Sequence, residues 1–550
     1  MPERILVCVG WPYANYLLHV GQAAGAYLPS DIFARYQRLS GKDVLMVSGS
    51  DSHGTPITMA ADKEGVDPQV IVDRYHAKIL EVWDRFGISF DLYTTTLTKN
   101  HYEVTQDVFL RLKEHGLLYP KTEEYLFDPE AERFLPDRYV EGTCPNCGYE
   151  DARGDQCDNC GKTLDAVELI NPRSKISGAT PILKPSEHYF LKLTAMEDRL
   201  KEWVSKQAHW RRNVLNFTLG MLNEGLKDRA ITRDISWGVP VPVEGYENKR
   251  IYVWFDAVIG YLSASKEWAR ASGDPEAWRL YWEDPAVRSY YFIGKDNIPF
   301  HTVIWPMMLM GYGGLNVPYD VPANQYVNFS ATQKQSKSKG TGNWMLELLD
   351  TYAPDVVRFY LTMVLPETND TEFREEDLIR ANNDILIATW GNLANRVISM
   401  IHRNFDGIVP ETGALSPEST AIIQEAHAAF ATVGKEINEC HFRAALQETI
   451  RLAQTANKYL DERAPWKAVK TDMAHAAETL ATALNVINAL KVLLHPVLPF
   501  STVQLHADLG VEGELIDHGW SYREVPAGTK LAPARPLYVK IDTEPVGAGA

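Results

Sequence analysis

The sequence predicts a mixed α/β protein with a parallel sheet in its N-terminal half and an α-helical bundle near its C-terminus. Over the first ~115 residues, short β-rich runs (ILVCVG, DVLMVSGSD) alternate with helical patterns (IVDRYHAKILEVWDRFG, VTQDVFLRLKEHG), which indicates parallel βαβ units. From about Asp377 onward, long amphipathic helical patterns dominate, as in a helical bundle.

The middle of the chain has a different pattern of hydrophobic and polar residues. From Tyr119 to about Ala230 the segments are short and polar and contain a cysteine cluster, which indicates an insertion. The alternation of β-rich and helical segments then resumes in RIYVWFDAVIGY and RSYYFIGKDNIPFHTVIWPMMLM. We therefore expect the following regions in order: the first half of the α/β domain (1–118), the insertion (119–230) with a cysteine knuckle at about 140–163, the second half of the α/β domain (231–325), a region with a lysine-rich loop (326–376), the helical bundle (377–527) and a loosely held tail (528–550).

Length and composition restrict the class of protein. A chain of 550 residues favours two to four structural units, and 45% hydrophobic with 23% charged residues is typical of a soluble globular protein. The net charge of −17 argues against a surface that binds nucleic acid indiscriminately, so an RNA partner would need local basic patches. We expect no membrane span and no signal peptide, and hence a cytoplasmic protein in which the isolated Cys8 and Cys440 are reduced and buried.

The stretch PYANYLLHVGQ, residues 12–22, follows an apolar run and leads into a helical pattern. A strand that enters a helix through a short loop presents unpaired backbone N–H groups and the positive end of the helix dipole, so anions collect there. His19 and Gln22 would lie on one face, and Gly21 would permit close approach. The motif favours a phosphate site, although by itself it also fits a solvated loop histidine.

A second basic motif is KQSKSKG, residues 334–340, with Lys334, Lys337 and Lys339 between serines. Lysines on a glycine-bounded loop can close over phosphate oxygens, and their charge matters most when a leaving pyrophosphate gains negative charge. Taken alone, the run also fits a solvated surface loop.

The cysteine cluster has a more specific pattern. Cys144 and Cys147 form one C-x2-C pair, and Cys157 and Cys160 form a second pair after nine intervening residues. Four thiolates in two knuckles fit one tetrahedral zinc with no open position for water, whereas a catalytic metal needs an open position and disulfides are rare in the cytosol. The pattern predicts one structural Zn²⁺ per chain.

HVGQ and KQSKS, in this order, resemble the two signature motifs of class I aminoacyl-tRNA synthetases, commonly written HIGH and KMSKS. PYAN, DSHGTP (51–56), YVWFDAVIGY (252–261) and FIGKDNIPFH (292–301) make the sequence most similar to the methionyl-tRNA synthetase family, over nearly the whole chain. The resemblance implies a Rossmann-type parallel-sheet catalytic domain, a connective insertion with a zinc knuckle and an α-helical anticodon-binding bundle.

The resemblance also implies a methionine pocket. Asp51 matches the aspartate that holds the substrate ammonium, and a carboxylate is the natural partner of an α-amino group. The thioether would lie among Tyr13, Trp254, Tyr261 and His301. Without the resemblance, Trp254 and Tyr261 would be taken as core residues.

Further residues are carried over in the same way. Asp296 matches a residue of the amino-acid pocket and Arg233 one implicated in activation, although a turn or N-cap residue and a surface ion pair are the structural alternatives. Two sets overlap: the ATP-binding residues are His19, Gly21, Gln22, Lys337 and Lys339, and the catalytic residues are His19, Gln22, Lys334, Lys337 and Arg233. Mg²⁺ would accompany the ATP.

The helical region carries an independent candidate site. GNLANR places Asn392 and Arg396 at i and i+4 on one helical face, where amide and guanidinium groups suit the edges of splayed single-stranded bases, and Trp466 could stack on one base. All three match residues with which the family reads the CAU anticodon. Each alone could equally be a polar group on a helix face or a partly buried tryptophan.

The chain departs from the family pattern at Tyr16, Gln22 and Gln335, where the family usually has glycine, histidine and methionine. Gln22 keeps a hydrogen-bond donor but cannot become cationic, so we expect activity to survive at a lower rate. The resemblance thus implies a monomeric methionine-tRNA ligase acting on ATP, L-methionine and tRNA(Met). The alternative is a catalytically impaired, synthetase-like RNA-binding or regulatory protein.

Overall fold

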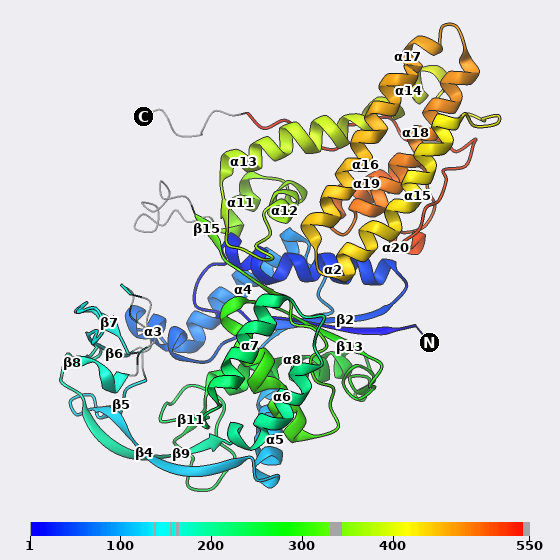
Figure 1. Cartoon of the computed structure of the whole chain (residues 1–550). Helices are drawn as coiled ribbons and strands as arrows, with labels where there is room; N and C mark the ends of the chain where they lie inside the picture. Colours follow the sequence, from blue (N-terminus) through cyan, green and yellow to red (C-terminus); the bar gives the residue numbers. More distant parts are fainter. Residues whose placement is uncertain are drawn as a thin grey trace, which may run out of the picture.

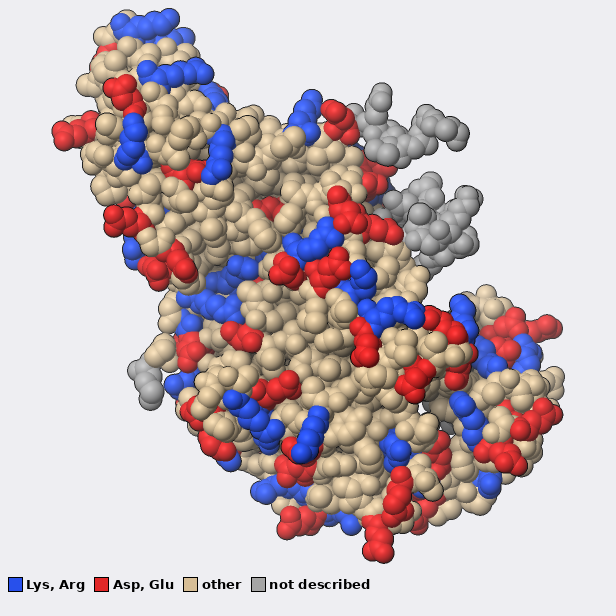
Figure 2. Space-filling model, turned by 180° about the vertical axis from the view of Figure 1, so that it is seen from behind, with Lys and Arg blue, Asp and Glu red and all other residues tan. Residues whose placement is uncertain are grey.

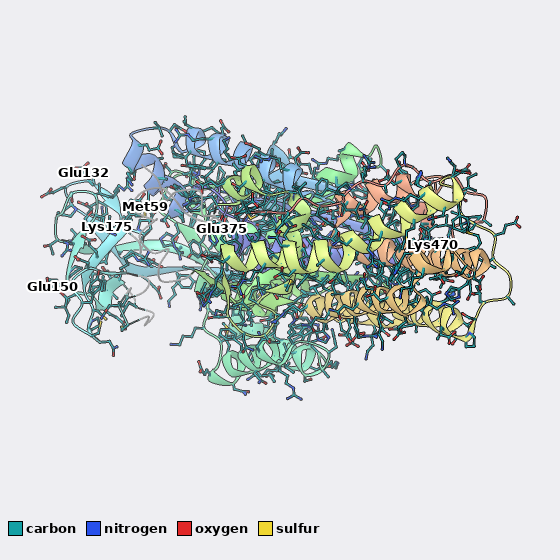
Figure 3. All side chains as sticks on the ribbon, turned by 90° about the horizontal axis from the view of Figure 1, so that it is seen from above. Met59, Glu132, Glu150, Lys175, Glu375 and Lys470 are labelled. Carbon is teal, nitrogen blue, oxygen red and sulfur yellow. The ribbon has the colours of Figure 1, made fainter. Side chains whose placement is uncertain are left out.

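The computed structural model describes residues 2–136, 139–154, 157, 159–160, 164, 166–329 and 344–542. An α/β domain lies between two outlying parts, a β-rich insertion on one side and a helical bundle on the other (Figure 1). Viewed from above in Figure 3, Glu132, Glu150 and Lys175 mark the insertion at one end of the molecule, and Lys470 marks the bundle at the opposite end. The expected α/β domain and C-terminal bundle are confirmed.

The central sheet has five parallel strands in the order β14-β13-β1-β2-β3. Its strands are β1 (Arg4–Val9), β2 (Asp43–Ser50), β3 (Leu92–Thr95), β13 (Arg288–Gly294) and β14 (Ala323–Asn324). From β1 the chain builds outward to β2 and β3, and later returns to add β13 on the other side of β1. The strand order therefore reverses between β1 and β13, which is where ligands bind in open α/β sheets.

The two faces of the sheet pack against two different hydrophobic cores, because successive side chains of a strand point to opposite faces. Ile5, Val7 and Val9 belong to a core that continues into the helical bundle, whereas Leu6 and Cys8 belong to the core beneath α5 and α8. Burial raises the pKa of the Cys8 thiol. The expectation that this cysteine is a buried filler is consistent with its position.

The long helix α4 (Pro68–Phe86) begins and ends at capping residues. Asp67 caps α4 by accepting from the backbone N–H of Gln69, and Gly87 ends it at a φ of +71°. The helices around the sheet are α1 (Val20–Gln22), η1 (Ala23–Tyr27), α2 (Leu28–Leu39), α3 (Thr55–Glu64), α4 (Pro68–Phe86), α5 (Lys99–Glu114), α8 (Val253–Ala271), α9 (Arg279–Trp282), η5 (Lys295–Asn297), η6 (Phe300–Ile304) and α10 (Trp305–Tyr312).

The insertion is built on an antiparallel sheet in the order β10-β9-β4-β5. Its strands are β4 (Leu118–Asp128), β5 (Arg133–Phe134), β9 (Ile182–Leu191) and β10 (Arg229–Ala230). A second small sheet, ordered β7-β6-β8, holds the cysteine region and comprises β6 (Val140–Thr143), β7 (Ala152–Arg153) and β8 (Ile170–Ser174). The helical elements beside these strands are η3 (Ala166–Glu168), η4 (Leu193–Met196), α6 (Glu197–Ser205), which continues directly from η4, and α7 (Arg212–Glu224). Met59 of α3 packs against the core of the insertion (Figure 3).

The segment between the α/β domain and the bundle contains β15 (Val327–Phe329) paired in parallel with β16 (Thr371–Phe373), and the helices α11 (Met345–Thr351) and α12 (Pro354–Met363). A small antiparallel pair, β11 (Thr232–Arg233) with β12 (Arg250–Ile251), leads into α8.

One long helical run carries the chain into the bundle (Figure 1), through α13 (Glu375–Arg380), η8 (Ala381–Gly391) and α14 (Asn392–Phe405). The bundle continues with α15 (Pro417–Asn438), α16 (Phe442–Arg463), α17 (Pro465–Ala468), α18 (Met473–Leu494), α19 (Pro499–Asp508) and α20 (Leu515–His518).

Helix α18 is the one helix of the described residues that is long and apolar enough to cross a membrane by length and composition, and 89% of its most apolar window is buried inside the molecule. The centre of a helical bundle selects the same apolar composition, because every face of such a helix contacts other helices.

Candidate active site

The ends of β1 and β2 lie side by side and place two predicted pocket residues together. The backbone N–H of Ala14 donates to the Asp51 carbonyl oxygen at 2.9 Å, and the backbone N–H of Asp51 donates to the Pro12 carbonyl oxygen at 2.8 Å. Tyr13 and Asp51 are thereby paired as in a parallel bridge. This pairing lies at the carboxyl edge of the sheet, where the strand order predicts a ligand site.

Asp51 is a buried carboxylate, 3% exposed, that accepts a hydrogen bond from the backbone N–H of His53 at 3.2 Å. Among the described residues, no Lys, Arg or His side chain forms an ion pair with it. Burial, and then the charge of Asp256, raise the pKa of Asp51 well above its ordinary value. A cationic ligand would stabilise the ionised form, because a buried carboxylate needs a partner of opposite charge.

Beside this carboxylate is a cavity of about 180 Å³. Aromatic rings form much of its wall: Tyr13 meets Trp254 edge to face, with ring centres 6.5 Å apart, and Trp254 stacks on Phe300 at 4.1 Å. The full lining is Tyr13, Gly54, Thr55, Pro56, Pro136, Arg233, Ile235, Tyr252, Val253 and Trp254. The cavity is therefore mostly apolar, with one guanidinium group.

That guanidinium belongs to Arg233, at the end of β11. Its Nη1 donates to the carbonyl oxygens of Ala230 and Thr232 at 3.0 and 2.8 Å, and its charged carbon lies 4.0 Å from the centre of the Tyr252 ring. These contacts hold Arg233 against the wall of the cavity, so a surface ion pair does not describe it.

Tyr261 and His301 form a buried hydrogen-bonded pair, with the Tyr261 hydroxyl 2.7 Å from Nε2 of His301. Nδ1 of His301 lies 2.9 Å from the carbonyl oxygen of Asn297. Nδ1 must donate to that carbonyl, so Nε2 accepts from the tyrosine. Burial lowers the pKa of His301 to about 4, which keeps the ring neutral at physiological pH.

The HVGQ segment starts a helix that runs without a break through α1, η1 and α2. Nδ1 of His19 accepts from the Gly21 backbone N–H at 3.1 Å, and Oε1 of Gln22 accepts from the His19 backbone N–H at 3.1 Å, so the two side chains form a capping box. Because Nδ1 accepts, Nε2 of His19 carries the ring proton and is the hydrogen-bond donor. A Cβ at Gly21 would lie 3.0 Å from two atoms of the His19 ring.

Lys334, Gln335, Lys337 and Lys339 lie outside the described residues. The described residues on both sides of that segment adjoin the HVGQ loop. Trp344 is paired with His19 as in an antiparallel bridge, and the backbone N–H of Met345 donates to the Leu18 carbonyl oxygen at 2.9 Å.

On the other side of the segment, the carbonyl oxygen of Val327 lies 3.6 Å from the place of a Cβ at Gly21. The described residues that flank the lysine motif on both sides, Val327 and Trp344, therefore lie next to the HVGQ loop.

Two predicted residues are placed differently from the rest. Tyr16, 49% exposed, packs edge to face on Trp344 with ring centres 5.0 Å apart and also contacts Tyr75, so its bulk is accommodated in an aromatic cluster near His19. Asp296 is exposed in η5, just beyond β13, and accepts a hydrogen bond from the Tyr326 hydroxyl. It does not line the aromatic cavity.

The four cysteines converge, with all four sulfur atoms within 4.8 Å of one another. Sγ of Cys144 lies 3.9 Å from Sγ of Cys160, and Sγ of Cys147 lies 3.6 Å from Sγ of Cys157. The side-chain amides of Asn146 and Asn159 donate to Cys160 and Cys147 at 3.5 and 3.6 Å. This is a preformed cluster of four sulfur ligands in the insertion.

Asn392 and Arg396 are exposed on one face of α14, at the end of the bundle far from the sheet. The guanidinium carbon of Arg396 lies 5.3 Å from the centre of the Trp466 ring, and its Nη2 lies 3.2 Å from Asp461. Figure 2 shows several Lys and Arg side chains at the far end of the bundle, with Asp and Glu side chains beside them. The cations that an RNA partner would need are therefore present at this end, although the net charge of the chain is negative.

A family model described as tRNA synthetases class I (M) matches residues 5–398, and a model described as the anticodon binding domain of methionyl tRNA ligase matches residues 409–548. The chain belongs to the methionyl-tRNA synthetase family. It is therefore an aminoacyl-tRNA synthetase, a ligase of translation, as the motifs predicted.

Curated relatives of this synthetase match over nearly their whole length. The methionine–tRNA ligase of Thermomicrobium roseum is 49% identical, covering 98% of this chain and 97% of that protein. The methionine–tRNA ligase of Dehalococcoides mccartyi is 53% identical, covering 98% of each. A solved structure of Mycobacterium tuberculosis methionyl-tRNA synthetase bound by methionyl-adenylate is 26% identical, with a TM-score of 0.81 over 98% of this chain and 100% of that one.

Several residues that contact the predicted site residues were not singled out from the sequence. Phe300 stacks on Trp254, Tyr252 holds Arg233, and His53 and Asp256 adjoin Asp51. All four lie inside the motifs that carried the family resemblance. The signal was therefore in the quoted stretches, but a single sequence does not show which members of a motif touch each other.

Proposed function

We propose that this chain activates L-methionine with ATP to form methionyl-adenylate and transfers the methionyl group to tRNA(Met). The observation that carries the proposal is the buried Asp51 carboxylate, which has no described ion-pair partner and lies beside an aromatic cavity. An amino acid with an apolar side chain supplies the missing cation and fills the cavity in one molecule.

In this proposal, the methionine ammonium pairs with Asp51, and the thioether lies against Tyr13 and Trp254. Tyr261 and His301 are buried outside the lining of the cavity as it stands, and we propose that they contact the thioether once methionine is bound. Sulfur makes favourable contacts with aromatic rings, and the neutral His301 adds no charge next to the apolar group. Arg233, on the cavity wall, supports the activation step. The assignment of Asp296 to the amino-acid site is supported by the family resemblance alone, because this residue is exposed in η5 and does not line the cavity.

The methionine carboxylate attacks the α-phosphorus of ATP, a new oxygen–phosphorus bond forms, and pyrophosphate leaves with its electron pair. The carboxylate is ionised at neutral pH and needs no base, so the protein acts by positioning and by stabilising charge. The Nε2–H of His19 and the side-chain nitrogen of Gln22 donate to phosphate oxygens beside Gly21. Mg²⁺ bound with the ATP would supply further neutralisation of phosphate charge.

We assign stabilisation of the leaving pyrophosphate to Lys334, Lys337 and Lys339. The support is the motif itself and the proximity of its flanking residues, Val327 and Trp344, to the HVGQ loop. The oxygen of a terminal tRNA hydroxyl then attacks the carbonyl carbon of the adenylate. The bond from that carbon to the phosphate oxygen breaks, AMP leaves with its electron pair, and the hydroxyl proton passes to the leaving phosphate or to water.

Zinc fits the four-cysteine cluster. Tetrahedral Zn–S bonds of about 2.3 Å separate neighbouring sulfur atoms by about 3.8 Å, close to the 3.6 and 3.9 Å found here. Cys144, Cys147, Cys157 and Cys160 fill all four positions, so the ion would be structural, and the amides of Asn146 and Asn159 would donate to the thiolates. Elemental analysis should find one zinc per chain, and Cys157→Ser should lose it.

At the far end of the bundle, Asn392, Arg396 and Trp466 are proposed to read the anticodon, supported by their exposure and by the stacking of Arg396 over Trp466. We further propose that the enzyme acts in the cytoplasm as a monomer. Light scattering of the purified protein at several concentrations tests the oligomeric state.

Exchange of labelled pyrophosphate into ATP, measured with each of the twenty amino acids in turn, tests the activity. We expect exchange with methionine alone. Exchange with a different amino acid would show that the pocket assignment is wrong, and no exchange with any amino acid would favour a synthetase-like RNA-binding protein impaired at Gln22 and Gln335.

A further inference from the structure

A second buried cluster of ionisable side chains adjoins Asp51. The two carboxylate oxygens of Asp256 contact two imidazoles: Oδ2 lies 2.7 Å from Nδ1 of His53, and Oδ1 lies 3.3 Å from Nε2 of His101. All three side chains are buried, and none of them lines the aromatic cavity. The contacts printed for the cluster instead lead to Asp51, through the backbone of His53.

Asp256 joins the two elements that build the proposed methionine pocket. It lies in the first turn of α8, the helix that carries Trp254 and Tyr261. His53 follows the end of β2, two residues after Asp51. The contact between Asp256 and His53 thus ties the ammonium-binding end of the site to the side-chain pocket.

His53 passes this constraint on to Asp51. Its ring is held at both nitrogens, by Asp256 at Nδ1 and by the Tyr102 hydroxyl at Nε2, 3.3 Å away. Its backbone N–H donates to Oδ1 of Asp51 at 3.2 Å. Fixing the ring fixes the backbone turn, and the turn fixes the orientation of the Asp51 carboxylate.

The charges of the cluster also indicate that Asp51 is the carboxylate available to a ligand. Burial, and then the nearby Asp256, raise the pKa of Asp51, whereas His53 and His101 outweigh the effect of burial on Asp256 and lower its pKa. Two neighbouring buried carboxylates need two positive or donating partners. The imidazoles serve Asp256, which leaves Asp51 for a cation from outside.

A metal ion does not fit between these three side chains as they stand. Tetrahedral zinc, with bonds of about 2.0 to 2.2 Å, separates its ligand atoms by about 3.4 Å, whereas the Asp256 oxygen and the His53 nitrogen are 2.7 Å apart. That spacing is a direct hydrogen bond.

We propose that Asp256, acting through His53, is a positioning residue for the methionine ammonium. It holds the Asp51 carboxylate at a fixed distance and angle from the aromatic pocket on α8, so that ammonium and thioether are bound together. The inference depends on the proposed assignment of Asp51 to the ammonium.

Replacement of Asp256 with Asn tests the inference, because the amide keeps the shape but is uncharged and has a single acceptor oxygen for the two imidazoles that Asp256 contacts. We expect the KM for methionine in pyrophosphate exchange to rise about tenfold, as for loss of a charged hydrogen bond, with kcat and the KM for ATP unchanged. Methioninol, which keeps the ammonium and lacks the carboxylate, should bind more weakly by the same factor. 4-(Methylthio)butanoate, which lacks the ammonium, should bind both proteins equally.

A pair of His53 variants separates positioning from a loss of folding. His53→Ala should behave like Asp256→Asn, whereas His53→Asn, whose amide nitrogen occupies the place of Nδ1, should restore most of the methioninol affinity. Glu267→Gln is a matched control on the same helix, because its carboxylate accepts from the Thr94 hydroxyl at 3.0 Å and lies outside the cavity lining. It should leave both ligands unaffected.

The inference is overturned if Asp256→Asn binds methioninol as tightly as the unchanged protein, or if it weakens methioninol and 4-(methylthio)butanoate equally. Asp51→Asn separates the assignment of Asp51 to the ammonium from the positioning role of Asp256. If Asp51→Asn also leaves methioninol binding unchanged, the ammonium assignment itself is wrong. If Asp51→Asn weakens binding and Asp256→Asn does not, only the role of Asp256 is wrong.

Discussion

At the scale of single residues, members of the HVGQ motif build the local backbone that also presents their donors. The amide oxygen of Gln22 accepts from the His19 backbone, so its amide nitrogen is the group that faces other partners. Glutamine at this position therefore keeps the helix start intact. The departure from the family's histidine changes the charge available to a phosphate without removing the cap.

Gly21→Ala tests the close packing in this motif. The new Cβ would lie 3.0 Å from Cε1 and Nδ1 of His19, so the imidazole must move. We expect kcat for pyrophosphate exchange to fall between about tenfold and a hundredfold, because small displacements of a positioning group are costly. Gly25→Ala, in the same helical run, meets no atom within 4 Å and should keep the original rate. Equal rates for both variants would show that the His19 position is unimportant.

At the scale of elements, α14 carries a candidate RNA site on a rigid support. The run through α13, η8 and α14 connects the α/β domain with the far end of the bundle (Figure 1). Its buried face, which includes Leu393, Val397 and Ile401, packs in the core, so Asn392 and Arg396 are directed outward by the helical period. Trp466 reaches the same place from α17.

Asn392→Ala and Arg396→Ala should each reduce tRNA charging while leaving pyrophosphate exchange unchanged, because the tip is remote from Asp51. We expect kcat/KM for tRNA(Met) to fall about tenfold or more for each, which corresponds to the 1–3 kcal/mol of one base contact. Arg403→Ala, exposed near the other end of the same helix, is the matched control. A parallel loss of exchange would contradict the anticodon assignment.

At the scale of the whole molecule, one side of the sheet and the bundle share a continuous hydrophobic core. Arg358 of α12, fully buried, lies at their junction. It pairs with Asp31 of α2 at 2.6 Å and donates to the carbonyl oxygens of Phe86, Pro496 and Val497. Although burial opposes ionisation, Arg35 and Arg358 lower the pKa of Asp31. The bundle is thus fixed to the α/β domain by polar contacts as well as by apolar packing.

Arg358→Met should lower the free energy of unfolding by about 3–5 kcal/mol, because it leaves Asp31 buried with one cation fewer and several carbonyl groups without donors. Arg374→Met, which removes an exposed pair with Glu372, should cost no more than about 1 kcal/mol. Urea unfolding followed by far-UV circular dichroism measures both. Similar losses for the two variants would mean that the junction is not a point of special stability.

Buried neutral histidines predict acid sensitivity. Burial lowers the pKa of His301 to about 4 and of His495 to about 3, whereas an unfolded chain has a value of about 6.5. The unfolded state therefore binds more protons between these values, so stability is full above about pH 6.5 and falls as the pH drops toward 4. In His495→Gln, the slope of unfolding free energy between pH 6 and pH 5 should be smaller by up to about 1.4 kcal/mol per pH unit. An unchanged slope would show that His495 is not buried in neutral form.

The sequence was sufficient for features that local pattern determines. Short β-rich apolar runs located β1 and β2, because a parallel strand with helices on both sides of its sheet is buried on both faces. Hydrophobicity with a period of 3.6 residues located α4 and α5, because it places the apolar residues on one face of a helix. The spacing of the cysteines predicted one cluster, since C-x2-C pairs turn two sulfur atoms to the same side. The order of the HVGQ and KQSKS motifs, together with the stretches quoted beside them, indicated the family.

Contacts between distant segments required the folded chain. Nothing in the local pattern of YVWFDAVIGY distinguishes Asp256 from a helix-capping acid, and nothing in DSHGTP shows that His53 meets it. Only the packing of α8 against β2 brings them to 2.7 Å. The sequence by itself determined the elements, the metal-ligand spacing and the family, because these depend on neighbours along the chain. The tertiary structure alone decided which carboxylate is left for the substrate, because that depends on which buried charges the fold has already paired.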